Sequence, residues 1–184
     1  MIMIAGNLRH AGYWDDVTVS KTFAPGQGFE LDAALTGIDN ETGDVDVVDD
    51  TDVITVRFNG AFDGGMTTCK GDTVNDGQVA IQRLFIRPAQ VDENERSSSL
   101  VCDTTVYTLN KPSGLLTVPS ATERIVLING IENMQVLYTS SEDGKFRTVR
   151  ADEVTDWTRI DSVTVALLSS TGDTVIGPPR VDNY

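Results

Sequence analysis

Apolar and polar residues alternate most regularly in the last third of the chain. Residues 125–128 (Ile-Val-Leu-Ile) are apolar without a break, which is the pattern of a strand buried on both faces. Gly130 interrupts the run, and Met134, Val136 and Tyr138 then resume it with the two-residue period of a half-buried strand. The pattern therefore predicts that this stretch supplies the core strands around which the rest of the chain is organised.

A second strand of the same kind is predicted at residues 160–168, where the alternate apolar residues from Val163 to Leu167 share one face. Between the two strands, residues 142–145 (Glu-Asp-Gly-Lys) predict a turn. Trp157 then closes a short segment that leads into the second strand. We therefore expect Trp157 and Tyr138 to be core anchors, and not a platform for a ligand.

The same period predicts a strand at residues 53–59, whose apolar residues Ile54, Val56 and Phe58 face inward. Arg57 lies between them and is expected to face outward. Further strands are predicted at residues 79–87, 100–102, 104–109 and 123–128. The loops that join the strands are short, so most neighbouring strands are expected to be antiparallel, about ten in all.

The first eleven residues predict an amphipathic helix, because Ile4, Leu8 and Ala11 fall on one face. His10 lies in its last turn, where a cation suits the helix dipole, and Gly12 can serve as its cap. Two interpretations remain open for this helix. It is either an ordinary surface helix or the end of a longer one, since a helix this short is marginal alone.

Composition limits the chemistry of the chain. Its 184 residues fit one domain. Because 28 Asp and Glu oppose 14 Lys and Arg, for a net charge of −14, the domain is expected to repel phosphate backbones and not to bind nucleic acid. No apolar run approaches the roughly 18–20 residues that cross a bilayer. His10 is the one histidine, so we predict no enzyme, no catalytic residue and no cofactor.

Residues 39–52 form the most acidic window of the chain and contain no basic residue. Asp44, Asp46, Asp49 and Asp50 make it a candidate calcium loop, since calcium prefers oxygen ligands. The spacing lacks the glycine and the final glutamate of an EF-hand. A solvated acidic loop is therefore the favoured interpretation, and the calcium site is the alternative.

The best-patterned region also carries a family resemblance. Residues 130–138 (Gly-Ile-Glu-Asn-Met-Gln-Val-Leu-Tyr) are followed by an acidic turn, by Asp156-Trp157, and by residues 162–168 (Ser-Val-Thr-Val-Ala-Leu-Leu). This order resembles the C-terminal half of PilW-type minor pilins of type IV pili, which are related to the J-type minor pseudopilins of type II secretion. In addition, residues 8–13 (Leu-Arg-His-Ala-Gly-Tyr) resemble the element that ends the long first helix of pilins.

The resemblance implies an α+β, pilin-like fold that is rich in β-structure. Residues 1–12 would be the C-terminal end of a long N-terminal helix, packed on the antiparallel sheet of a globular domain at residues 13–184. Ile2 and Met3 lie outside the predicted buried stripe of that helix. We therefore expect them to form an assembly surface with neighbouring helices.

The function implied by the resemblance is that of a non-catalytic minor pilin that helps to prime pilus assembly, at the pilus tip. Its partners would be other minor pilins, the major pilin and, through the missing first part of the helix, the inner membrane. It would be located in the inner membrane and periplasm of a Gram-negative bacterium and in the extracellular pilus. A calcium-dependent extracellular β-sandwich binding module is the alternative.

Cys69 and Cys102 are compatible with buried free thiols, a reactive pair or a disulfide. Neither has a C-x-x-C spacing or a histidine nearby in the sequence, which argues against redox catalysis and a zinc site. Because the family resemblance implies export from the cytoplasm, a structural disulfide is the favoured interpretation.

Overall fold

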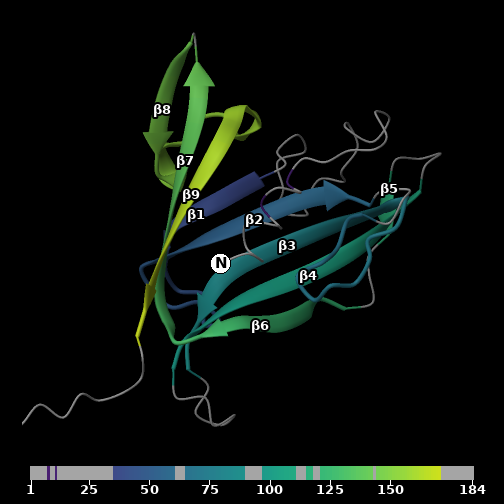
Figure 1. The fold of residues 1–184 in the computed structure, drawn as a ribbon, viewed down its shortest axis with the longest axis horizontal. Helices are drawn as coiled ribbons and strands as arrows, with labels where there is room; N and C mark the ends of the chain where they lie inside the picture. Colours follow the sequence, from purple (N-terminus) through teal and green to yellow (C-terminus); the bar gives the residue numbers. More distant parts are fainter. Residues whose placement is uncertain are drawn as a thin grey trace, which may run out of the picture.

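In the computed structural model, the described residues are Leu8, Ala11 and residues 35–60, 65–89, 97–110, 115–117, 121–142 and 144–170. They form nine strands and two short 3₁₀ turns (Figure 1). The strands are β1 (Leu35–Glu41), β2 (Thr51–Asn59), β3 (Gln78–Arg87), β4 (Ser99–Asn110), β5 (Leu115–Thr117), β6 (Glu123–Asn129), β7 (Ile131–Glu142), β8 (Lys145–Val149) and β9 (Ile160–Ser169). The turns are η3 (Ala151–Glu153) and η4 (Trp157–Arg159).

The strands make two antiparallel sheets. The larger sheet has six strands in the order β1-β2-β3-β4-β5, with β6 pairing β4 as well. The smaller sheet has the order β8-β7-β9. Figure 1 shows the smaller sheet crossing the larger one steeply, and β7 makes most of the contact, chiefly with β2.

The predicted α+β, pilin-like fold is wrong for the described part of the chain. That part is all-β, and its helical elements with defined bounds are the two three-residue 3₁₀ turns. The physical reason is that apolar residues recur with a period of two in almost every described segment, which suits strands and not helices. Ile2, Met3 and His10 lie outside the described residues. Leu8 is helical and, with Ala11, is half-buried against the main core.

The main core lies between the two sheets. Ile54 and Val56 from β2 meet Met134, Val136 and Tyr138 from β7, and each of these five side chains is at most 1% exposed. The predicted strand periods in these two segments therefore describe the core correctly. The segments predicted at 100–102 and 104–109 are one continuous strand, β4.

The opposite face of the large sheet is covered too, which makes one prediction wrong. Arg57 is only 1% exposed, although it was expected to face outward. On that face Val53 and Phe85 form a second buried cluster with Val47, which belongs to the acidic window. The window therefore folds back over the part of this face around Val53 and Phe85.

Gly130 is the point at which the chain leaves one sheet for the other. It lies between β6 and β7, with φ +77°, and its amide donates to the carbonyl of Ser98 at 2.9 Å. A Cβ at this position would lie 2.9 Å from the carbonyl oxygen of Ser170, so a glycine fits and a larger residue would be strained. The prediction that residues 125–128 are buried on both faces is wrong. They belong to β6, which among the described strands pairs with β4 alone, and Val126 there is 41% exposed.

Candidate functional site

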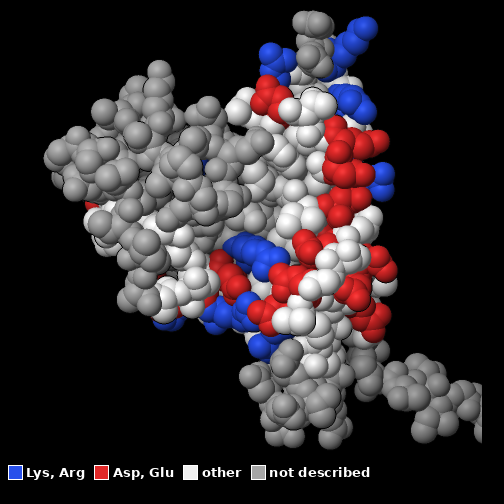
Figure 2. Space-filling model, turned by 180° about the vertical axis from the view of Figure 1, so that it is seen from behind, with Lys and Arg blue, Asp and Glu red and all other residues white. Residues whose placement is uncertain are grey.

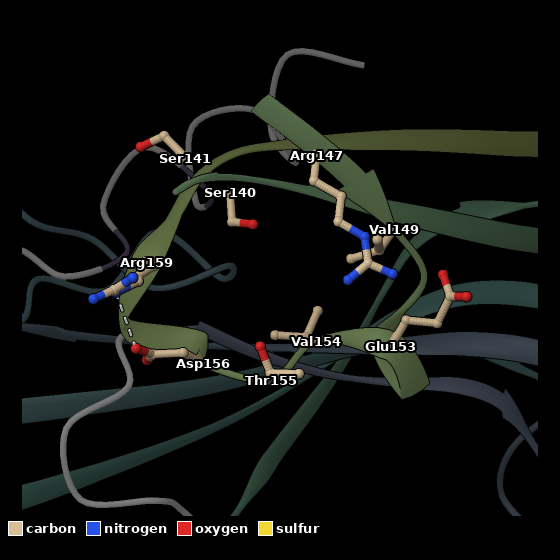
Figure 3. Close-up of a pocket in the computed structure, with 9 residues that line it drawn as sticks. All are labelled: Ser140, Ser141, Arg147, Val149, Glu153, Val154, Thr155, Asp156 and Arg159. Carbon is tan, nitrogen blue, oxygen red and sulfur yellow. Dashed lines mark ion pairs between the residues drawn. The ribbon is translucent and has the colours of Figure 1, made fainter. Parts of the chain in front are cut away.

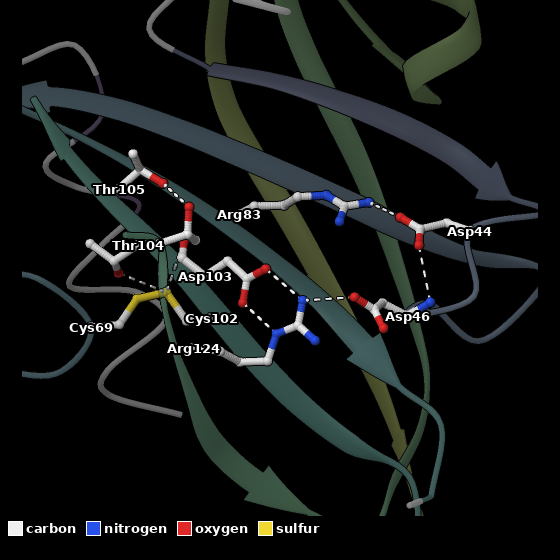
Figure 4. Close-up of polar contacts among 10 residues, drawn as sticks. Asp44, Asp46, Cys69, Arg83, Cys102, Asp103, Thr104, Thr105 and Arg124 are labelled. Carbon is white, nitrogen blue, oxygen red and sulfur yellow. Dashed lines mark hydrogen bonds and ion pairs between the residues drawn. A yellow bond between two sulfur atoms is a disulfide. The ribbon is translucent and has the colours of Figure 1, made fainter. Parts of the chain in front are cut away.

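The acidic window is fastened to the large sheet by two arginines. Nη2 of Arg83 donates to Oδ2 of Asp44 at 2.9 Å. Arg124 donates from Nε and Nη2 to the two carboxylate oxygens of Asp103 at 2.7 and 2.8 Å, and from Nη2 to Oδ2 of Asp46 at 3.1 Å (Figure 4). Figure 2 shows basic side chains lying among acidic ones on one face of the molecule. The window is thus docked by ion pairs and is not a freely solvated loop.

Beneath the ion pairs lies a buried aromatic ring. Cζ of Arg83 is 4.6 Å and Cζ of Arg124 is 5.1 Å from the ring centroid of Phe85, which is fully buried. Both guanidinium groups therefore interact with the ring as well as with carboxylates. The hydrogen bond from the Asp46 amide, followed by that from Arg83, lowers the pKa of Asp44.

These contacts bear on the candidate calcium residues. Asp44 and Asp46 are engaged by guanidinium groups, and Asp49 accepts only a long hydrogen bond from the Gly43 amide at 3.4 Å. Asp50 is exposed and has a positive φ of 61°. Within the described ranges, no group of three or more Asp, Glu, His or Cys side chains could hold a metal ion. The calcium site stays a prediction that no observed contact favours.

A buried carboxylate connects the two sheets. Oδ2 of Asp52, on β2, accepts a 2.6 Å hydrogen bond from the amide of Val136, on β7. Its Oδ1 accepts a 2.9 Å bond from the amide of Asn40, on β1. The register of β8 with β7 ends at Tyr138, so Asp52 supplies the acceptor that β8 no longer offers at Val136. No pattern in the sequence distinguishes Asp52 for this role, because it is one acidic residue among seven in the window.

Tyr138 and Trp157 pack together as a pair. Their ring centroids are 4.8 Å apart with planes at 82°, an edge-to-face arrangement. The ring of Tyr138 is fully buried, and its hydroxyl has no hydrogen-bond partner in the described structure. Burial, followed by the nearby Asp52 and Asp39 carboxylates, raises the pKa of Tyr138. This environment suits a packing residue better than an acid or base.

The predicted disulfide is present. Cys69 and Cys102 are bonded, and both are at most 3% exposed. The bond joins the loop before β3 to strand β4 across 33 residues. Closing a loop of that length contributes about 3.7 kcal/mol in the chain-entropy description.

A small polar cavity lies between the β7–β8 hairpin and the turns η3 and η4. Its volume is about 280 Å³. Figure 3 shows the side chain of Arg147 directed into it from β8, with the ion pair between Arg159 and Asp156, 3.3 Å long, on the far side. The lining residues are Ser140, Ser141, Arg147, Val149, Glu153, Val154, Thr155, Asp156 and Arg159. Since this set contains no histidine, cysteine or lysine, it lacks an obvious partner to activate a serine as a nucleophile.

Comparisons of the chain with known protein families, with curated proteins and with solved structures found no match. In the part of the chain that the structure describes, no helix has the length and apolar character needed to span a membrane. A function must therefore be inferred from the residues of the chain itself.

Proposed function

We propose that the chain is a non-catalytic assembly subunit, a minor pilin of the PilW type that takes part in priming a type IV pilus. The observation that carries the proposal is the order of residues 130–138, Asp156-Trp157 and residues 162–168. These segments belong to one structural unit, formed by β7, η4 and β9. Within it Trp157 packs edge-to-face on Tyr138. The conspicuous residues of the family pattern therefore have packing roles in this chain.

Two further features support an exported subunit. The Cys69–Cys102 disulfide is typical of proteins that fold outside the cytoplasm. Leu8 and Ala11, which belong to the segment that resembles the end of the pilin helix, are half-buried against the main core. The proposal does not depend on a long helix within the described residues. It includes other minor pilins and the major pilin as partners, and the inner membrane of a Gram-negative bacterium as the site of assembly.

Deleting the gene in its source bacterium tests the proposal. Surface pili, counted by electron microscopy, should fall to a small fraction of the wild-type number and return when the full-length gene is supplied. The complementing protein should also co-purify with the other minor pilins. Pili that remain at wild-type number in the deletion strain, with no co-purification, would remove the proposed function.

The Ile2 and Met3 assembly surface stays part of this proposal as a prediction. Both positions lie outside the described residues, so its test is genetic. Ile2→Asp and Met3→Asp should abolish complementation while leaving the melting temperature of the purified domain unchanged, since the two side chains are expected to be buried only against partner helices.

A further inference from the structure

Strand β9 forms an open edge of the small sheet. It pairs with β7 from Ile131↔Ser169 to Ser140↔Ile160, and no pairing on its other side involves a described residue. The strand is ten residues long, and Asp161 is its one charged residue. It contains no proline. A long edge with a single charged residue is a ready template for another strand.

The other described edges carry the features that normally prevent such pairing. Strand β8 has five residues, two of which are the basic Lys145 and Arg147. Strand β1 ends in Asp39 and Glu41 and has an irregular register near Ile38. Strand β5 has three residues, and β6 begins with a glutamate and an arginine. Strand β9 is thus the least protected of the sheet edges.

The direction of the free backbone groups on β9 follows from the Asp52 contact. The Val136 amide donates to Asp52 and not to β9, yet Val136 is directly opposite Val165. The pair is therefore of the non-hydrogen-bonded kind, in which both residues direct their N–H and C=O groups away from each other. By the two-residue period, Val163, Val165 and Leu167 all present these groups to the open edge.

The side chains of the same three residues are also incompletely covered. Val163, Val165 and Leu167 pack against the main core, but each is only half-buried. On the neighbouring strand, Met134 and Val136 are 1% exposed. An added strand with apolar residues on its inner face would complete the burial at β9.

We propose that β9 receives an extended strand from a different subunit of the assembly. The occupying strand carries apolar residues at the positions that face the core, and lysine or arginine beyond them. The basic character follows from the net charge of −14, which attracts a basic segment and opposes the approach of a second copy of this chain. Strand addition of this type draws its affinity from backbone hydrogen bonds and its specificity from alternate side chains. The inference rests on the proposed assembly function.

The availability of the edge is tested by amide hydrogen exchange on the isolated full chain. The amides of Val163, Val165 and Leu167 should exchange at least tenfold faster than those of Thr164 and Ala166, which bond to β7. Equal protection of the two sets would show that the edge is already occupied, and would overturn the proposal.

The role of the edge is tested by two variants in the deletion strain. Val165→Pro removes the outward N–H that a partner strand would use, and breaks no bond to β7. Val165→Ala is the matched control, since it also shortens the side chain but keeps the N–H. Val165→Ala should restore pili and Val165→Pro should not, although both purified proteins melt at similar temperatures.

The outcomes separate the inference from the function on which it rests. If the deletion leaves pili intact, the assembly function fails. If Val165→Pro restores pili as well as Val165→Ala does, the edge inference fails and the function stands. If Val165→Pro does not fold, the hydrogen exchange of the wild-type amides on β9 decides whether the edge inference stands. Sedimentation should show a monomer, and a dimer lost in Val165→Pro would make a second copy the occupant and contradict the basic partner.

Discussion

Removing the Asp52 carboxylate should destabilise the domain more than the loss of any other described acidic side chain. Asp52 is 1% exposed and accepts hydrogen bonds from the amides of Val136 and Asn40 at 2.6 and 2.9 Å. In Asp52→Ala both amides lose their acceptor. An unsatisfied buried donor costs about 1–3 kcal/mol, and the Val136 amide is buried while that of Asn40 is partly buried.

The expected loss in free energy of unfolding for Asp52→Ala is therefore about 2–5 kcal/mol. Relief from burying a charge reduces the loss toward the lower end of this range. Asp52→Asn keeps one acceptor oxygen, so it should lose about half as much. Since a domain of this size is stable by about 5–15 kcal/mol, either change should be easy to measure.

Urea denaturation followed by tryptophan fluorescence measures the effect. The midpoint should fall in the order wild type, Asp52→Asn, Asp52→Ala, with an unchanged slope. Asp49→Ala is the control, because Asp49 is exposed and accepts only a 3.4 Å bond, and it should change stability by less than about 0.5 kcal/mol. If Asp52→Ala is as stable as Asp49→Ala, the carboxylate does not hold the two sheets together.

Four other results are expected. Replacing Cys69 and Cys102 by serine should lower the free energy of unfolding by about 3.7 kcal/mol, measured by urea denaturation, and two alkylatable thiols in the native protein would contradict the disulfide. Gly130→Ala should cost about 1–3 kcal/mol because φ is +77° there, whereas an unchanged melting temperature would refute the strain. Tyr138→Phe should be neutral or stabilising, because it removes a buried hydroxyl that lacks a partner. The pKa of Asp44 is lowered below 3.8 in the folded state. Its contribution to the free energy of unfolding is therefore complete above pH 3.8 and is lost as the pH falls through the folded pKa. Asp44→Asn should make the free energy of unfolding less dependent on pH in this acid range.

Local patterns in the sequence were enough to locate most of the strands, whereas β1 lies in a stretch where no strand was predicted. The periods of two at residues 53–59, 79–87 and 160–168 correspond to β2, β3 and β9, and the turn predicted at residues 142–145 joins β7 to β8. Such periods record which face of a single strand is apolar, so they can be read without knowledge of its neighbours. The disulfide was favoured only through the family resemblance, which implies export, because two cysteines alone are also compatible with free thiols or a reactive pair.

Which strands meet, and what covers them, was decided by tertiary structure alone. Residues 125–138 appeared as one organising stretch, yet Gly130 divides it between two sheets. Arg57 has the pattern of a solvent-facing residue but is only 1% exposed. On the same face of the sheet, the acidic window packs over Val53 and Phe85 and is held there by ion pairs with Arg83 and Arg124. Asp52 cannot be told from its acidic neighbours until β7 brings the Val136 amide within 2.6 Å. The physical reason is that a strand's period is a property of its own residues, whereas burial, ion pairing and hydrogen bonding between sheets depend on segments far away in the chain.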